Sequence, residues 1–285
     1  MLTKQIALVS KTNKIKLSEL TQVAAALQKQ ATRDLGPIWS MQATVDPFQK
    51  LKDVPGGYWP IIIKDKIDDP SAAGYHSDKY RQPFALVAFD EAWPLTCSHE
   101  MCEMLVDPFG NHMVSSGSIK KGQGRVNYLV EVCDPSEDDK FCYSVNGIML
   151  SDFYTPHYFD PVKATSIRYS FTGAITEPKQ VLKGGYLSWL DPATGKWWQA
   201  NHFGTHLQVD DISAKMEMLE GNLRSRIDRI TASPRMTEGV SKEHIKKNKQ
   251  QAASQVKYGI KFENHWEQEI NRLLKPRKVM MMKKQ

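Results

Sequence analysis

The first fifty residues alternate between short apolar runs and one amphipathic stretch. Residues 5–10 (QIALVS) form an apolar run of strand length. Apolar positions recur at helical spacing through residues 17–35, and Gly36-Pro37 follows, so this stretch predicts a helix that ends there. Residues 38–45 (IWSMQATV) alternate between apolar and polar positions, as strands do. A strand, a helix and a strand in this order predict a parallel βαβ unit.

The next apolar runs predict two more strands and a second helix. Residues 58–64 (YWPIIIK) and 83–89 (PFALVAF) have the length and composition of strands. Across a short connector, a helical stretch begins near Thr96. Pro108 ends this helix, because a residue that precedes proline is pushed out of the helical conformation.

The acids and the imidazole of the second predicted helix lie on one side. With His99 at zero and roughly 100° per residue, Glu103 lies near ~40° and Glu100 near ~100°. Asp107 lies near ~80° on the same wheel, but the proline after it places it at or beyond the last turn. The apolar residues take the remaining arc: Met101, Cys102, Met104, Leu105 and Val106. A helix that buries this arc presents His99 and Glu103 side by side, with Glu100 beside them.

This spacing resembles the metal-binding motif H-E-x-x-H, with Glu103 in place of the second histidine. His99 can supply a neutral imidazole nitrogen to a metal ion, and Glu103 can supply a carboxylate oxygen one turn later. Glu100 is then the expected general base, which takes a proton from metal-activated water. The alternative is a polar helix face that contacts solvent and binds nothing.

The second half of the main body predicts mainly β-structure. Gly, Ser and Lys residues predict a loop over residues 109–124, and strand-like runs follow from about residue 125. Asn146-Gly147 and residues 191–195 (DPATG) have the composition of hairpin turns. We expect residues 151–206 to be mostly β and to pack on the first part of the chain.

A third region begins near residue 209. Met216, Leu219, Leu223 and Ile227 recur there at helical spacing. We therefore predict an α+β fold in two parts. Residues 1–208 form a mixed-sheet domain, and residues 209–285 form a helical, basic extension.

The positive charge of the chain is concentrated in this extension. The whole chain has a formal net charge of +6. Residues 241–285 contain twelve Lys and Arg and four Glu, a charge of +8, which leaves residues 1–240 at −2. The main body is therefore not expected to bind nucleic acid through its net charge. An acidic partner or a nucleic acid could bind residues 240–285, and the alternative is a solvated, charged pair of helices.

Cysteine spacing and hydropathy exclude several classes. Cys97, Cys102, Cys133 and Cys142 lack the C-x-x-C spacing of a zinc ribbon. We expect small buried thiols, with a Cys133–Cys142 disulfide as the alternative. No apolar run reaches the ~20 residues that a membrane-spanning helix needs, and the first residues lack a signal-peptide pattern. We therefore expect a cytoplasmic protein without a membrane span.

Four segments of the chain stand out together: SHEMCEMLVDP (98–108), YLVEVCDPSE (128–137), SDFYTPHYFDP (151–161) and KGGYLSWLDPATGKW (183–197). In this order they resemble a family of largely uncharacterised bacterial and phage proteins. The signature of that family is roughly S-H-E-x-x-E-x-x-x-D-P, E-V-C-D-P-x-E, F-x-x-P-x-[WY]-F-D and G-G-Y. The resemblance covers about residues 1–200 and does not extend to the last part of the chain.

The resemblance implies a zincin-like, metal-binding domain. Glu131 is the implied third ligand beside His99 and Glu103, because it belongs to the E-V-C-D-P segment. A catalytic zinc site has three protein ligands and one open position. The alternative ligands or supporting groups are Asp107, Asp134 and His76. Zn²⁺ is the expected metal, and Mn²⁺ or Fe²⁺ become competitive because two carboxylates make the site harder.

A zincin-like arrangement also implies a substrate class. We expect residues 83–89 to be an edge strand that borders a cleft, so that a peptide or protein substrate pairs with it. Tyr158 or His157 would contact an oxyanion or the substrate. The leading interpretation is therefore a metal-dependent hydrolase of the peptidase type. The alternative is a non-catalytic, metal-stabilised binding or structural module, such as a phage or assembly component.

Overall fold

The opening βαβ unit is present as predicted. Strand β1 (Lys4–Ser10) pairs in parallel with β2 (Ala43–Phe48), and α1 (Leu17–Lys29) connects them. The structure is a computed structural model. It describes residues 3–68, 72–231, 241–243, 245–246, 250, 265 and 267–272.

The helix that follows β1 is longer than the sequence indicates. A wider, π-helical turn (Gln30–Leu35) and α2 (Gly36–Trp39) continue α1 past the predicted stop at Gly36. Pro37 comes just after the wider turn, where the regular hydrogen-bond pattern of the helix is already interrupted. The chain leaves the helix only at Ser40, whose φ is 52°. The predicted strand therefore begins at Ala43 rather than at residue 38.

A five-stranded sheet forms one side of the molecule, in the order β2-β1-β3-β5-β4. Its first three neighbouring pairs are parallel, and β4 pairs with β5 in the antiparallel direction. The remaining strands are β3 (Trp59–Lys64), β4 (Gly74–Lys79) and β5 (Gln82–Ala88).

The prediction of an edge strand at residues 83–89 was wrong. Strand β5 pairs with β3 on one side and with β4 on the other, so its hydrogen-bonding edges are both used. The edge strand next to β5 is β4, which the sequence did not indicate, and β2 is the edge on the other side. The hairpin that makes it turns at Tyr80 and Arg81, with φ values of 53° and 64°. These are left-handed positions without the Gly or Asn that announces such a turn.

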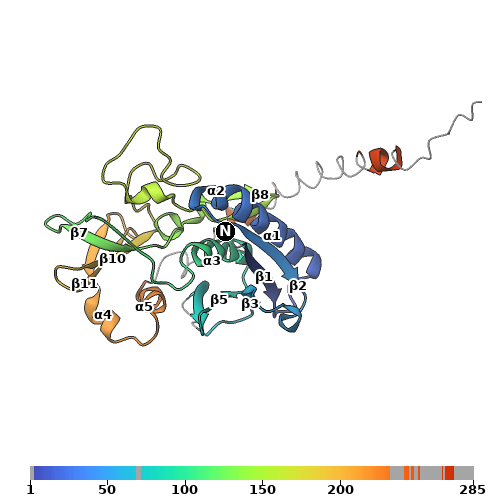
Figure 1. Cartoon of the computed structure of the whole chain (residues 1–285), viewed down its shortest axis with the longest axis horizontal. Coiled ribbons are helices and arrows are strands. Elements are labelled where there is room, and N and C mark those ends of the chain that lie inside the picture. Colours follow the sequence, from blue (N-terminus) through green and yellow to red (C-terminus); the bar gives the residue numbers. More distant parts are fainter. Residues whose placement is uncertain are drawn as a thin grey trace, which may run out of the picture.

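Helix α3 (Trp93–Val106) carries the polar arc and follows β5, as predicted. It begins three residues earlier than expected, because Pro94 occupies its first turn. Asp107 has left the helix, with φ −131° and ψ 74°. Figure 1 shows α3 in the middle of the molecule, between the strands of the first sheet and those of the second.

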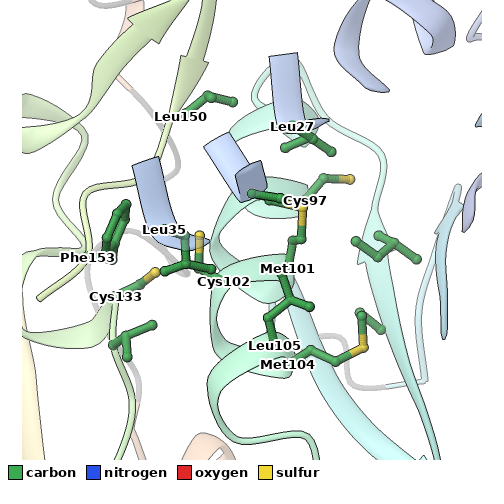
Figure 2. Packing of buried hydrophobic residues seen from close by; sticks show 14 of the residues in the cluster. Leu27, Leu35, Cys97, Met101, Cys102, Met104, Leu105, Cys133, Leu150 and Phe153 are labelled. Atoms are coloured by element: carbon green, nitrogen blue, oxygen red, sulfur yellow. The ribbon is translucent and has the colours of Figure 1, made fainter. Parts of the chain in front are cut away.

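The apolar arc of α3 lies in the main hydrophobic core. Figure 2 shows Met101, Cys102 and Leu105 packed among side chains of the first helix and of later segments, such as Leu35 and Phe153. One face of the first sheet belongs to the same core through alternate residues of its strands: Ile6, Leu8, Ile61, Ile63, Ala85 and Val87. Helices α1 and α3 therefore cover the same face of the sheet.

A second, antiparallel sheet follows α3 in the order β12-β11-β10-β7-β6. The hairpin around residues 191–195 is confirmed, and so is the hairpin at Asn146-Gly147. The segment from 109 to 124, expected to be a loop, contains β6. The strands of this sheet are β6 (Met113–Gly117), β7 (Arg125–Leu129), β10 (Tyr186–Asp191), β11 (Lys196–Asn201) and β12 (Gln208–Asp211).

The segment between the hairpin at Asn146-Gly147 and β10 has little regular structure. The small hairpin consists of β8 (Tyr143–Val145) and β9 (Ile148–Leu150). After it, residues 151–185 contain a short helical turn at Pro156–Phe159 and an isolated bridge between Tyr154 and Ser170. This part of the chain is therefore less β-rich than expected.

The chain then turns back toward the first sheet. Helix α4 (Ser213–Glu217) is followed by α5 (Leu223–Ile230), and the Asn222 side chain donates a hydrogen bond to Ser77 of β4 at 2.9 Å. The predicted boundary near residue 209 falls within β12 and stays a prediction. Most of the basic segment expected to bind an acidic partner or a nucleic acid lies outside the described residues.

The cysteines and the helices bear on two expectations from the sequence, buried thiols and the absence of a membrane span. All four cysteines are free thiols; Cys97, Cys102 and Cys133 are buried. The alternative of a Cys133–Cys142 disulfide is therefore wrong. Among the described residues, we find no helix with the length and apolar character required to span a bilayer.

Candidate metal centre

The polar arc of α3 is buried rather than solvated. The side chains of His99 and Glu100 are each 3% exposed, and that of Glu103 is 0% exposed. Strand β4, the segment that follows β7 and helix α5 cover this arc. The interpretation of a solvated helix face is therefore wrong, and each buried charge needs a partner.

Three groups converge at one end of the arc. The Nε2 atom of His99 lies 3.4 Å from Oε1 of Glu103 and 3.1 Å from Oδ1 of Asp134. All three side chains are buried, and their ligand atoms lie within 4.8 Å of one another. Oδ1 of Asp134 has no hydrogen-bond partner among the described residues. An imidazole and two carboxylates at this separation can hold a divalent cation.

Arg224 of α5 binds the other oxygens of the same two carboxylates. Its Nη2 donates to Oε2 of Glu103 at 2.8 Å, and its Nη1 donates to Oδ2 of Asp134 at 2.9 Å. The guanidinium therefore fixes the orientation of each carboxylate through one oxygen. It does not contact the other oxygen, which points to His99. This is how a supporting shell orients metal ligands.

Glu131, the ligand implied by the resemblance, belongs to a different contact. Its Oε1 accepts a hydrogen bond from Nη1 of Arg224. Its other oxygen has no partner among the described residues. Asp134, expected as an alternative, is the residue that joins His99 and Glu103. Glu131 thus stays a predicted ligand, and its closest contact is the guanidinium.

A second group lies on the other side of Glu103. The Nδ1 atom of His76 is 3.5 Å from Oε2 of Glu100 and 3.8 Å from Oε2 of Glu103, and it makes no hydrogen bond with the described residues. The other ring nitrogen of His76 lies 3.1 Å from the backbone oxygen of Asp107. If Nε2 carries the proton and donates it to this carbonyl, Nδ1 is unprotonated, and its lone pair points toward Glu100 and Glu103. The second group can therefore also accept a cation or a proton.

Asp107 supports the centre through the backbone. Its carboxylate accepts a hydrogen bond from the backbone N–H of His112 at 2.8 Å, and its carbonyl oxygen holds His76. It contributes no ligand atom to either group. The prediction that Pro108 removes it from the helix face is confirmed.

Three glycines allow the covering segments to approach. A Cβ on Gly74 would lie 3.2 Å from a carboxylate oxygen of Glu100, and a Cβ on Gly110 would lie 2.5 Å from Cβ of Arg224. A Cβ on Gly185 would lie 2.6 Å from the backbone oxygen of Asp134. Gly185 therefore lets its segment pack directly on the backbone of Asp134 and Pro135.

The electrostatics of the cluster follow from burial and from the single guanidinium. Burial raises the pKa of Glu103, but Arg224 and His99 outweigh it and hold the pKa below its ordinary value. The pKa of Asp134 is raised well above its ordinary value by burial and by the neighbouring Glu103. Burial lowers the pKa of His76, but the adjacent carboxylates outweigh it and raise the pKa.

The aromatic candidates do not join the centre. Tyr158 is buried, its hydroxyl donates to the backbone oxygen of Gln180 at 3.1 Å, and its ring stacks on Tyr154 at 4.3 Å. His157 is 54% exposed and pairs with Asp160 at 2.9 Å. Both roles stay predictions without a supporting contact.

Two residues of the cluster were missed from the sequence. Arg224 and Asp228 occupy successive turns of α5, and Nε of Arg224 lies 3.0 Å from Oδ1 of Asp228. An Arg and an Asp four residues apart are also the ordinary pattern of a solvated ion pair on a helix. The sequence carries no signal that separates these two cases.

Comparison of the chain with family models, with curated proteins and with solved structures finds no match. The arguments about function therefore rest on the geometry of the cluster.

Proposed function

We propose that the chain is a metal-dependent hydrolase with a zincin-like arrangement, and that peptides are its substrate class. The observation that carries the proposal is that Nε2 of His99 faces Oε1 of Glu103 and Oδ1 of Asp134. These are the carboxylate oxygens that Arg224 does not bind. Such a set of atoms offers one cation a neutral imidazole and two carboxylates.

The charge of the cluster supports a bound cation. Arg224 is the shared partner of four buried carboxylates: Glu103, Glu131, Asp134 and Asp228. One guanidinium cannot neutralise four ionised carboxylates. Without a further cation, burial and Glu103 hold the pKa of Asp134 well above its ordinary value, which favours its neutral form. A divalent cation beside His99 would supply the missing positive charge.

The donor set favours particular metals. Imidazole and carboxylate ligands suit Zn²⁺, and two carboxylates bring Mn²⁺ and Fe²⁺ into competition. Such a cation supplies Lewis acidity, which activates water for attack on an amide carbonyl. We assign Zn²⁺ as the first metal to test.

Glu100 is the residue that we assign to proton transfer. It follows His99 directly in the sequence, and its Oε2 lies 3.5 Å from Nδ1 of His76. A carboxylate beside an imidazole can take up a proton from water and release it to a leaving amine. His76 is in turn oriented through its contact with the carbonyl of Asp107.

The order of elements supports the zincin-like part of the proposal. A mixed sheet ends in the antiparallel edge strand β4, and α3 with its His99 follows β5 directly. In this arrangement the edge strand, rather than residues 83–89, is the place for an extended peptide. Helix α5 lies against β4, so a peptide would have to share this edge with α5.

A non-catalytic, metal-stabilised module is the second candidate, and deep burial favours it. His99, Glu103 and Asp134 are each no more than 3% exposed, and Arg224 covers two of them. A cation at this position would stabilise the contact between α3, the 131–134 segment and α5. This candidate predicts metal-dependent stability without cleavage of any peptide.

Metal content and peptide cleavage together test the proposal. The purified protein should contain one equivalent of a divalent metal by elemental analysis, and His99→Ala should lose it. His157→Ala is the matched control, because this exposed histidine lies outside the cluster. Equal metal content in wild type and His99→Ala would contradict the proposed centre. Bound metal with no cleavage across a peptide library would instead favour the module.

A further inference from the structure

A pocket of about 450 Å³ lies beside the metal-centre cluster and belongs to neither group of candidate ligands. Tyr75 of β4 and Phe84 of β5 line one side of it, with Ala72 nearby. Helix α5 provides the other side through Asp228 and Arg229. Two aromatic residues and a buried acid therefore share one cavity large enough for a small organic group.

Asp228 is the buried charge of this pocket. Its side chain is 4% exposed, yet neither of its carboxylate oxygens makes a hydrogen bond with the described residues. Nε of Arg224 forms an ion pair with Oδ1 at 3.0 Å, whereas Oδ2 has no partner of either kind among the described residues. Oδ2 is therefore a buried acceptor without a donor, which is unfavourable. The carboxylate is therefore suited to a donor that enters from the pocket.

The other charges at the pocket are exposed. The side chain of Asp68 is 78% exposed and lies 3.5 Å from Lys64. Arg229 is exposed, and it donates to the backbone oxygens of Ser225 and Glu220 on its own side of the pocket. Water and salt screen such charges far more than a buried one. Asp228 consequently decides which sign of charge the pocket accepts.

The walls of the pocket suit an apolar body behind the charged group. The rings of Tyr75 and Phe84 and the methyl group of Ala72 present apolar surface. Aromatic rings also attract an adjacent cation through their π faces.

We propose that this pocket binds a primary ammonium group carried on an apolar stem or ring. The Asp228 carboxylate accepts the hydrogen bonds of the ammonium group, and Tyr75 and Phe84 surround the stem. A lysine side chain and a small free amine share this chemistry. The inference depends on neither the metal nor hydrolysis, so its test is separate from that of the proposed function.

Titration calorimetry of the full-length protein with three matched probes tests the pocket. Benzylamine should bind at least about ten times more tightly than benzyl alcohol, because only the amine supplies a charged donor to Asp228. Phenylacetate, an anion of similar size, should not bind. The same titration in the presence of a chelator should give the same result. A further probe, Nα-acetyl-lysine amide, distinguishes the sources: tighter binding than benzylamine assigns a lysine side chain, and weaker binding assigns a free amine.

Variants identify the residues responsible. Asp228→Asn keeps the size of the side chain and should weaken benzylamine binding about tenfold or more, whereas Asp68→Asn at the exposed rim should change it less than about twofold. Ala72→Phe should block the pocket and abolish benzylamine binding without a change at Asp228. This variant replaces Asp228→Asn as the test if Asp228→Asn fails to fold. Unchanged affinity in Ala72→Phe would overturn the proposal.

Two results with the probes would also overturn it. Equal affinities for benzylamine and benzyl alcohol would mean that the pocket recognises only the apolar ring. Tighter binding of phenylacetate, lost in Arg229→Ala, would mean that the exposed guanidinium rather than Asp228 decides the sign of the ligand.

Discussion

The guanidinium of Arg224 and the imidazole of His99 hold opposite oxygens of the same two carboxylates. Arg224 binds Oε2 of Glu103 and Oδ2 of Asp134, while His99 Nε2 faces Oε1 and Oδ1. A residue of α5 therefore fixes the orientation of groups on α3 and after β7. The stability of the protein and the affinity of the proposed metal centre should both depend on this arginine.

Substitution of Arg224 should destabilise the protein strongly. Arg224→Ala leaves four buried carboxylates without their shared cation, so the free energy of unfolding should fall by about 3–5 kcal/mol in chemical denaturation. Arg224→Lys should recover only part of this, because an ammonium group cannot reproduce the planar fork that binds several carboxylates. Zinc affinity should fall in both variants.

The exposed Arg229 provides the control for this prediction. Arg229→Ala should change the free energy of unfolding by no more than about 0.5 kcal/mol. A similar loss in Arg224→Ala and Arg229→Ala would show that α5 is held by its general charge rather than by the contact of Arg224 with the cluster.

Glu100→Gln should separate metal binding from catalysis. The amide has the size of the carboxylate but cannot take up a proton, so the variant should keep its metal and lose about 10²–10⁴-fold in peptide turnover. Metal content and initial rates measured on the same preparation check this. Wild-type turnover in Glu100→Gln would remove Glu100 as the proton acceptor.

Gly110→Ala should displace α5 from the cluster. Gly110 has a φ of +60°, and an added Cβ would lie 2.5 Å from Cβ of Arg224. Gly195 has a similar φ of +69° but nothing within 4 Å of an added Cβ. Gly195→Ala therefore measures the backbone strain alone, on the order of 1 kcal/mol. A larger loss in Gly110→Ala, with weaker zinc binding, is expected, and equal losses would argue against the close contact.

Stability should change with pH through Asp228. Burial raises the pKa of Asp228 to about 6, although Arg224 opposes the shift. An unfolded aspartate loses its proton near pH ~4, so between these values the folded protein binds more protons than the unfolded chain. The contribution of Asp228 to the free energy of unfolding is therefore present below pH ~4 and declines as the pH rises to about 6.

Urea denaturation across this pH range measures the effect. Asp228→Asn does not titrate, so the fall in stability between pH ~4 and ~6 should be smaller in this variant than in wild type. Asp68→Asn, at an exposed position, should leave the wild-type profile unchanged. Identical profiles for wild type and Asp228→Asn would show that Asp228 does not titrate in this range.

Several features of the fold follow from local sequence alone. The βαβ unit, the hairpin at Asn146-Gly147 and the helix that carries His99 depend on spacing and turn chemistry within short segments. The juxtaposition of His99 and Glu103 is also local, because a helical period fixes which residues share a face. These features could therefore be predicted.

The segments that pack against the His99 and Glu103 face of α3 could not be predicted in the same way. The edge strand β4 turns at Tyr80 and Arg81, which carry no turn signal, so the strand order was misjudged. The choice between Glu131 and Asp134 depends on how the segment after β7 packs on α3, and not on either residue's own neighbours.

The sequence by itself determined that one helix presents an imidazole and acids together, because that property depends on a period within fourteen residues. Only the tertiary structure decided that this face is buried, that Asp134 joins His99 and Glu103, and that Arg224 neutralises part of the charge. Arg224 lies more than a hundred residues from Glu103 in the chain. Contacts over such distances are set by the packing of whole elements, which no local pattern records.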